Sequence, residues 1–393
     1  MERVQMKKTI SIILAAVMLA GCAKTPENVK SRVHRENSGN EVATEMIPPS
    51  DLQSAGEQAL KNDYAQFNVG SVKLSLPSEV NEVEFTQASG FESGYEMVFD
   101  SLLGKDFWRG ESVTKQTDTS EYGGMTTCSF RNESRKVYGC VGDNGFITFI
   151  KPDCFNDPYA SQAETVRVYD TGSGERSGDK YRLADGDYSI SETVDFANRW
   201  LKENYSVFEP DVTFWVKSVA VKKRGQEYCF SVGVQKLFGG VPLDDMAIIQ
   251  SKDDYQKAQY IVSRIQLTIH RRADVSSFTN GTGIIIPNVK GKVLQLLSLQ
   301  SVLELCRDKF TAYNEINLRS IALKYTIEPV YSPDDPYKSF NYAGKRFSSH
   351  IIWELLVDDR ENKDKAPTKL KYIFVDSQTG EISFDFDGVT VEW

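Results

Sequence analysis

Apolar residues recur with two different periods along this chain, and the period changes in a regular order. Between residues 65 and 187 they form short runs and alternations, such as 146–150, which predict a β-rich domain. At 191–204 they recur every three to four residues, which predicts an amphipathic helix. Further strands are predicted after this helix, at 212–221, 228–234 and 261–269.

The same order of elements occurs a second time further along the chain. Ser298 is a candidate N-cap for a helix whose apolar positions continue at helical spacing as far as Tyr313. We therefore predict an α+β fold, in which a β-rich N-terminal domain precedes two modules, each a helix followed by an antiparallel sheet. The strands of the second module are predicted at 316–325, 351–357, 370–375 and 382–386.

These changes of pattern divide the chain into five segments. Residues 23–63 are polar, poor in aromatic side chains and interrupted by prolines, which indicates a flexible stalk; only 51–60 is expected to form a helical turn or two. The predicted segments are a leader at 1–21, the stalk at 22–64, the β-rich domain at 65–187 and the two modules at 188–290 and 291–393.

The first segment has the pattern of an export signal. Lys7 and Lys8 precede an apolar run at 9–20, which is too short for a membrane span of about 17–25 residues. The sequence LAGC at 19–22 resembles the lipobox of bacterial lipoproteins, in which the cysteine sulfur is diacylated and the preceding bond is cut. This resemblance implies that Cys22 anchors the protein in the cell membrane, facing outside the cytoplasm. The alternative is a secretory peptide in which Cys22 is incidental.

The two modules resemble a known family. In the second, WELLVD at 353–358 and YIFVDSQTGEI at 372–382 resemble the end of PepSY-like domains, where a strand leads to a V-D-x-x-T-G-E-I hairpin. In the first, YCFSV at 228–232 and GGVPL at 239–243 are similar to a strand and turn of related modules. The chain as a whole resembles uncharacterised lipoproteins of low-GC Gram-positive bacteria. The resemblance implies binding of partner proteins or peptidases at the envelope, and it brings no catalytic residues.

One predicted hairpin contains two cysteines. Segments 125–130 and 137–141 flank a polar turn, so Cys128 and Cys140 are expected roughly opposite each other on paired strands. Disulfides form in exported proteins, and this pair is a candidate for one. Two buried free thiols are the alternative.

Composition and motifs argue against several classes of site. The net charge is −9, with 46 Lys and Arg against 55 Asp and Glu, so no nucleic-acid partner is expected. There are three histidines and no zinc-ligand spacing, so no metal or other cofactor is expected. Neighbouring acids such as Asp244 and Asp245 point to opposite faces of a strand, and we interpret them as solvated turns and edges. No catalytic residue is predicted.

An insertion between two strands of the second module is rich in aromatic side chains. Exposed aromatic clusters anchor many protein interfaces, so this insertion is a candidate partner surface; packing within a long loop is the alternative. Its aromatic residues are Tyr331, Tyr337, Phe340, Tyr342 and Phe347.

Three functions are compatible with these features. The first is non-enzymatic binding of an unidentified envelope protein or peptide, in which exposed sheet edges capture an extended strand. The second is an envelope hydrolase that acts on peptide or glycan through carboxylates paired by folding. The third is a solute-binding lipoprotein of a transporter, although the order of helix and strands does not suggest its two parallel-sheet lobes.

Overall fold

Most of the chain beyond the predicted leader and stalk is described by the structure, a computed structural model. Residues Glu45–Trp393 form one compact unit. Cys22 lies outside the described residues. These are 44–393 with the exception of 71, 73, 110–112, 120–125, 152–162, 172–177, 244–246, 250–258, 262–264, 282, 330–343, 358–369, 387–388 and 393.

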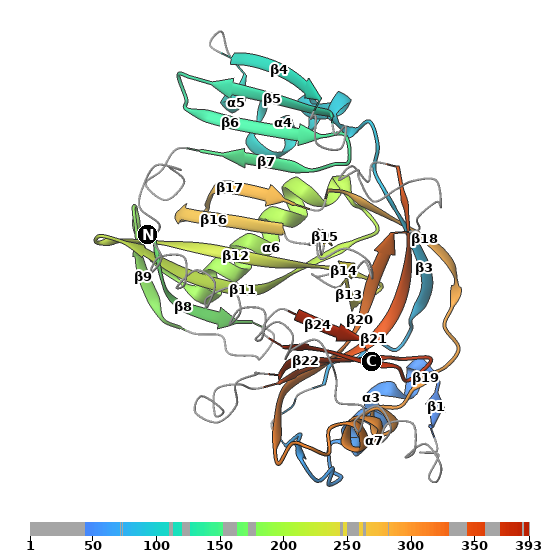
Figure 1. Cartoon of the computed structure of the whole chain (residues 1–393). Coiled ribbons are helices and arrows are strands. Elements are labelled where there is room, and N and C mark those ends of the chain that lie inside the picture. Colours follow the sequence, from blue (N-terminus) through green and yellow to red (C-terminus); the bar gives the residue numbers. More distant parts are fainter. Residues whose placement is uncertain are drawn as a thin grey trace, which may run out of the picture. The chain divides into compact units, whose positions relative to one another are not determined.

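In this part of the chain, ten strands form one antiparallel sheet (Figure 1). The order along the sheet is β4-β5-β6-β7-β17-β16-β12-β11-β8, and β13 also pairs with β12. Ile265, Leu267 and Ile269 alternate with more exposed residues, so one face of the sheet lies on a hydrophobic core. The strands are β4 (Val113–Thr119), β5 (Thr126–Asn132), β6 (Val137–Gly142), β7 (Ile147–Ile150), β8 (Glu164–Asp170), β11 (Thr213–Arg224), β12 (Glu227–Phe238), β13 (Val241–Pro242), β16 (Ile265–Arg271) and β17 (Asp274–Asn280).

The amphipathic helix predicted at 191–204 is confirmed as α6 (Ile190–Trp200), which packs on β11 and β12. Its start is a capping box: the Ser189 hydroxyl accepts a hydrogen bond from the Glu192 N–H, and the Glu192 carboxylate accepts one from the Ser189 N–H. A π-helical turn, η3 (Leu201–Tyr205), and a 3-10 turn, η4 (Ser206–Phe208), continue the helix toward β11.

A second antiparallel sheet has its own hydrophobic core. Its order is β18-β3-β21-β22-β23-β24, and β20 pairs with β21 and, in parallel, with β2. Helix α7 (Leu299–Lys309) contributes to this core and begins as predicted at Ser298, whose side chain accepts from the Ser301 N–H. The strands are β2 (Phe67–Asn68), β3 (Asn81–Gln87), β18 (Ile285–Lys292), β20 (Ile316–Pro329), β21 (Arg346–Val357), β22 (Leu370–Asp376), β23 (Ile382–Phe386) and β24 (Val389–Glu392).

The order predicted from the two periods is confirmed. Helix α6 is followed by β11, β12, β16 and β17, each paired with the next, and α7 is followed in the same way by β20, β21, β22 and β23. The fold is therefore α+β, with two helix-then-sheet units.

Shorter elements surround the sheets. Helices α4 (Tyr95–Leu103) and α5 (Lys105–Trp108), after the 3-10 turn η2 (Phe91–Gly94), form a core with β5 and β6. Gly139 on β6 is required there, because a Cβ at this position would lie 2.2 Å from the ring of Phe130 and 2.6 Å from that of Phe99. Two separate hairpins are β9 (Lys180–Leu183) with β10 (Gly186–Ser189), and β14 (Ala247–Ile249) with β15 (Gln259–Ile261).

The sheets do not follow the predicted division at 187/188. Strand β7 of the predicted β-rich domain pairs with β17 of the first module, so these two segments share one sheet. Strand β3 joins the other sheet, between β18 and β21. Alternation along a strand shows that it is half buried but does not identify its neighbour, because strand pairing is decided by contacts between distant segments.

The predicted stalk is wrong from Glu45 onward. Strand β1 (Met46–Ile47) pairs with β19 (Leu296–Leu297), and the Glu45 N–H donates to the Ser301 hydroxyl at 2.8 Å. After a 3-10 turn, η1 (Pro49–Asp51), helix α3 (Leu52–Ala59) packs against α7 and leaves Leu52 and Ala59 only 1% exposed. The short helix expected at 51–60 is therefore confirmed as α3, and what the polar composition did not indicate is its packing against α7.

The predicted hairpin between β5 and β6 is confirmed, but its register separates the two cysteines. Cys128 pairs with Val141, and Cys140 pairs with Ser129, so the two thiols point to opposite faces of the sheet. Both cysteines are free, and the predicted disulfide is absent. The turn sets this register: Asn132 Oδ1 accepts from the Arg135 N–H at 3.0 Å, and Lys136 takes a left-handed conformation with φ of 51°.

Candidate functional site

Several strands at the ends of the two large sheets could receive an added strand. Pro287, Lys290 and Lys292 on β18 make that edge a poor partner for another strand. Strand β4, at one end of the ten-stranded sheet, exposes the polar residues 115–118. Strand β8, at the opposite end, exposes 48% of Val166 and 61% of Val168. Among these edges, β8 combines exposed apolar side chains with the absence of proline and lysine.

The backbone of β8 alternates in the direction of its hydrogen bonds. The Thr171 N–H donates to the Lys217 carbonyl at 3.0 Å, just beyond the register that pairs Tyr169 with Val219 and Val168 with Ala220. Since alternate residues of an antiparallel strand bond to the same neighbour, Val168 directs its N–H and C=O away from β11. Within the described residues no strand pairs with that outer side.

A cluster of phenols and charges holds β8 on its inner face. The Tyr169 hydroxyl donates to Asp179 at 2.7 Å and lies 2.7 Å from the Tyr181 hydroxyl. Arg167 Nη1 also bonds Asp179, at 3.1 Å, and its guanidinium lies 4.7 Å from the centre of the Tyr169 ring. Tyr181 packs in turn against Tyr228, with ring centroids 5.4 Å apart. These contacts hold Arg167 in place while leaving 59% of its side chain exposed.

Charge differs between the two ends of β8. Its first residues lie beside Lys222 and Lys223 of β11, which pair in register with Thr165 and Glu164. Its last residue, Asp170, forms an ion pair of 3.0 Å with Arg319 of β20. The two lysines outnumber the one acid at the start of the strand, Glu164, whereas the charges of Asp170 and Arg319 cancel at its end, and this difference favours one orientation of a bound acidic chain.

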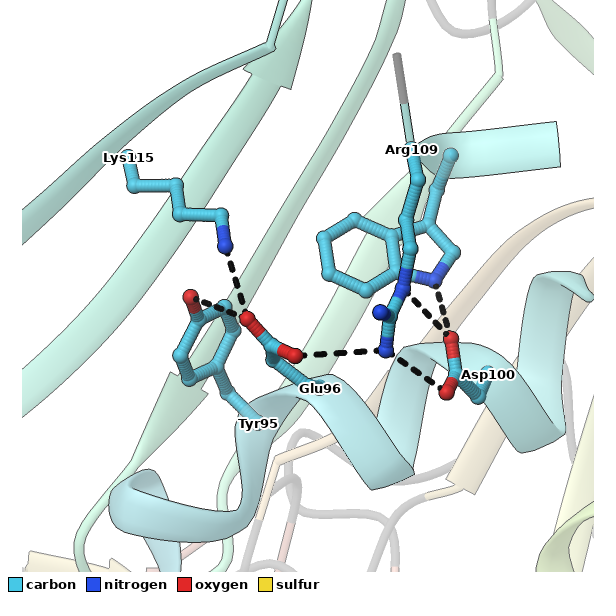
Figure 2. A network of polar contacts seen from close by, with 6 residues as sticks. Tyr95, Glu96, Asp100, Arg109 and Lys115 are labelled. Carbon is cyan, nitrogen blue, oxygen red and sulfur yellow. Dashed lines mark hydrogen bonds and ion pairs between the residues drawn. The ribbon is translucent and has the colours of Figure 1, made fainter. Parts of the chain in front are cut away.

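A second polar cluster lies between α4 and β4 (Figure 2). Asp100 accepts bonds from Arg109 Nε at 3.0 Å and Nη2 at 2.8 Å, and from the Trp108 indole N–H at 3.0 Å. Glu96 bridges two cations, with Lys115 Nζ at 2.7 Å and Arg109 Nη2 at 3.2 Å. Figure 2 shows both carboxylates, one helical turn apart, pointing toward the same guanidinium.

This cluster, the α4–β4 clamp, attaches the strand to the helix and is not a catalytic acid–base pair. The hydrogen bond from Lys115, followed by the one from Tyr95, lowers the pKa of Glu96, so this carboxyl stays ionised. A glycosidase of the paired-carboxylate type needs one acid with a raised pKa. Glu96 and Asp100 therefore give the hydrolase hypothesis no support, and their contacts attach β4 to α4.

A third polar cluster is completely buried. Lys236 Nζ lies 2.8 Å from Glu209 Oε1 and 2.9 Å from the Gly283 carbonyl. Glu209 Oε1 also accepts from the Tyr205 hydroxyl at 2.5 Å, and Asn280 Nδ2 donates to that hydroxyl at 2.6 Å. Burial lowers the pKa of Lys236 and raises that of Tyr205 well above its usual value.

The position of the buried cluster explains its role. Tyr205 ends η3 and Asn280 ends β17, while Gly283 lies just before β18, where the chain passes from one sheet to the other. Because the side chains of Lys236 and Glu209 have no exposed surface, the cluster offers none to a ligand. Its hydrogen bonds join η3, β12 and the segment between β17 and β18.

The predicted aromatic partner surface is contradicted at Phe347, its one member among the described residues. Phe347 is 1% exposed, and it pairs with Phe85 of β3 in the second sheet's core, so its assignment to a surface is wrong. Phe347 belongs to strand β21 and not to an irregular loop, and the alternation of that strand directs its side chain into the core. The other four residues of that surface, Tyr331, Tyr337, Phe340 and Tyr342, lie outside the described residues.

Other chemistry-bearing residues make structural contacts. His270 is buried and its Nε2 lies 3.5 Å from Glu227 Oε2. Nowhere among the described residues do three His, Cys, Asp or Glu side chains gather as a metal site would require. The described helices include none that is long and apolar enough to cross a membrane.

The β8 edge was not identified from the sequence. A usable signal was present, because Val166 and Val168 alternate with Thr165 and Arg167 in a polar region. The run is short, and the sequence does not show that it lies at the end of a sheet.

What the comparisons with known proteins show is a similarity of fold. No family model matches the chain, and no curated protein matches it significantly. An uncharacterised protein from Eubacterium rectale, known from its crystal structure, is similar in fold, with a TM-score of 0.51 and 12% identity over 77% of this chain and 86% of that one. The C-terminal domain of YpeB from Bacillus megaterium is a more distant structural neighbour, with a TM-score of 0.34 and 9% identity over 78% of this chain and 98% of that one.

Proposed function

We propose that this protein is a membrane-anchored, extracytoplasmic lipoprotein that binds an extended segment of an envelope protein along β8, without catalysis. The observation that carries the proposal is the combination at Val168: its side chain is 61% exposed and its backbone hydrogen-bonding groups point away from the sheet. An added strand satisfies those groups and covers the apolar side chain, which is the chemistry of β-strand addition.

The anchor is proposed to be lipid on Cys22. The sequence at 19–22 resembles a lipobox, and the basic and apolar parts of the leader precede it in the required order. Two or three acyl chains are enough for stable attachment, since each buried CH₂ contributes about 0.8 kcal/mol. The acidic chain gains nothing from an anionic membrane surface, so the lipid supplies the attachment.

The two helix-then-sheet units are proposed to be PepSY-like modules. The turn that carries the resemblance in the second unit is well formed: Asp376 Oδ1 accepts from the N–H groups of Gln378 and Thr379, and Gly380 has a φ of 76°. These residues build a hairpin, which supports a scaffold role for the modules. The β8 edge then supplies the binding surface.

Site-specific photo-cross-linking tests the proposal in cells that make the lipidated protein. Benzoylphenylalanine replaces Val168 on β8 and, as the matched control, Val289 on β18, which is 52% exposed on the edge with proline and lysines. We expect irradiation to give a discrete adduct with an envelope protein from position 168 and none from position 289. Equal adducts from both positions, or none from either, would contradict capture at β8.

A further inference from the structure

The inference concerns the chemistry of the segment that β8 receives, and it rests on the proposed function. The direction of that segment is the first step. Every pairing within the ten-stranded sheet is antiparallel, including that of β8 with β11. Val168 presents both its N–H and its C=O outward, so an antiparallel segment places one residue directly opposite Val168 and exchanges two hydrogen bonds with it.

The side chains flanking Val168 define what lies opposite them. Val168 and Arg167 are consecutive residues of β8, so they point to opposite faces of the sheet. A residue paired with Val168 gains by being apolar, and one paired with Arg167 gains by being acidic, since opposite charges on directly opposed strand residues attract. Arg167 is positioned for this contact by Asp179 and by the Tyr169 ring, and the ion pair uses one of its five N–H donors.

The other charges along β8 determine on which side of the apolar residue the acids of the bound segment lie. Lys222 and Lys223 lie next to the first residues of β8, on the same side of Val168 as Arg167, and they outnumber the one acid there, Glu164. An antiparallel segment brings to that side the residues that follow the one opposite Val168. On the opposite side, the charge of Asp170 is paired with Arg319, so an acid there gains no net attraction.

From this geometry we infer that β8 takes an antiparallel segment in which an apolar residue, seated on Val168, is followed on its C-terminal side by acidic residues. Arg167 is the residue that selects the acid opposite it, Lys222 and Lys223 add positive charge one strand further in, and the Val168 backbone holds the strand. The partner is thus an extended, acidic-ended stretch of protein with alternating apolar residues before the acids.

Fluorescein-labelled peptides test the inference on the full chain. The peptide TVTVETE has the inferred order, TVTVKTK reverses its charge, and ETEVTVT reverses its direction at the same composition. We expect anisotropy titrations at low salt to show TVTVETE binding about tenfold more tightly than either of the others, in line with a few charge pairs at an exposed edge. The preference should shrink as salt is added.

Two variants separate the inference from the proposed function. Arg167→Glu is expected to invert the preference between TVTVETE and TVTVKTK, whereas Lys290→Glu on β18 leaves it unchanged. Val168→Pro removes an N–H that β11 does not use and is expected to abolish binding of all three peptides. If the three peptides bind equally and Val168→Pro still abolishes binding, the acidic specificity is wrong and edge capture stands. If Val168→Pro leaves binding intact, edge capture itself is wrong.

Discussion

The ammonium of Lys236 lies 2.8 Å from the carboxylate of Glu209, and both side chains are completely buried where the chain passes between the two sheets. Removing either partner leaves the other charge buried without its counter-ion, which costs about 3–5 kcal/mol. We therefore expect Lys236→Met and Glu209→Gln each to lower the free energy of unfolding by about that amount. Urea denaturation followed by circular dichroism measures it.

A matched surface pair provides the control for this prediction. Lys290 and Glu84 form an ion pair of 2.9 Å whose side chains are 40% and 35% exposed. Lys290→Met is expected to change stability by less than about 1 kcal/mol, because solvent screens exposed pairs. If Lys236→Met and Lys290→Met lower the free energy of unfolding by the same small amount, the Lys236–Glu209 pair is not buried as described.

The α4–β4 clamp gives a prediction about pH. The Lys115 hydrogen bond lowers the pKa of Glu96 below that of a free glutamate, about 4.3, so the stabilisation is complete above that value and is lost as the pH falls through the lowered pKa. We expect Glu96→Gln to speed amide exchange of β4 at neutral pH. Near pH 2 the variant and the parent should exchange alike, and a difference that persists there would rule out this ion pair as its source.

The cysteines differ sharply in expected reactivity. Cys128 is half-buried, whereas Cys140 and Cys306 are buried, and burial raises the pKa of both of these thiols. Iodoacetamide at pH 8 should therefore modify Cys128 in the folded protein and reach Cys140 and Cys306 only after denaturation. Peptide mass spectrometry identifies the sites, and a Cys128–Cys140 disulfide in the exported protein would contradict the observed register.

Anchoring through Cys22 is tested by one substitution. Cys22→Ala removes the sulfur that a diacylglycerol would occupy, and we expect the variant to leave the membrane fraction for the soluble one. Cys306→Ala is the control, since it removes a thiol while leaving the leader unchanged. Partition in a detergent phase separation measures the change, and a variant that stays with the membrane as the parent does would disprove the lipid anchor.

Local patterns were enough to predict both helices of the repeated units. The cap at Ser298 and the apolar stripe behind it lie within a few residues of each other, so α7 follows from short-range rules. Likewise, the alternation at 261–269 predicted β16, and the polar turn at 131–136 predicted the hairpin of β5 and β6. The exact register of that hairpin depends on the conformation of Lys136, and a symmetric pairing about Ser134 missed it by one residue.

The sequence by itself therefore determined the α+β class and the repeated order of helix and strands, because periodicity and capping are local properties. Tertiary structure decided which strands are neighbours: β7 meets β17, and α3 packs against α7. It also decided the candidate site. Val168 sits in an ordinary alternating run, and only its place at the end of a ten-stranded sheet leaves its side chain exposed and its backbone directed outward. Strand neighbours are decided by contacts between surfaces that are far apart in the chain. The sequence of one strand does not show which distant surface it will bury.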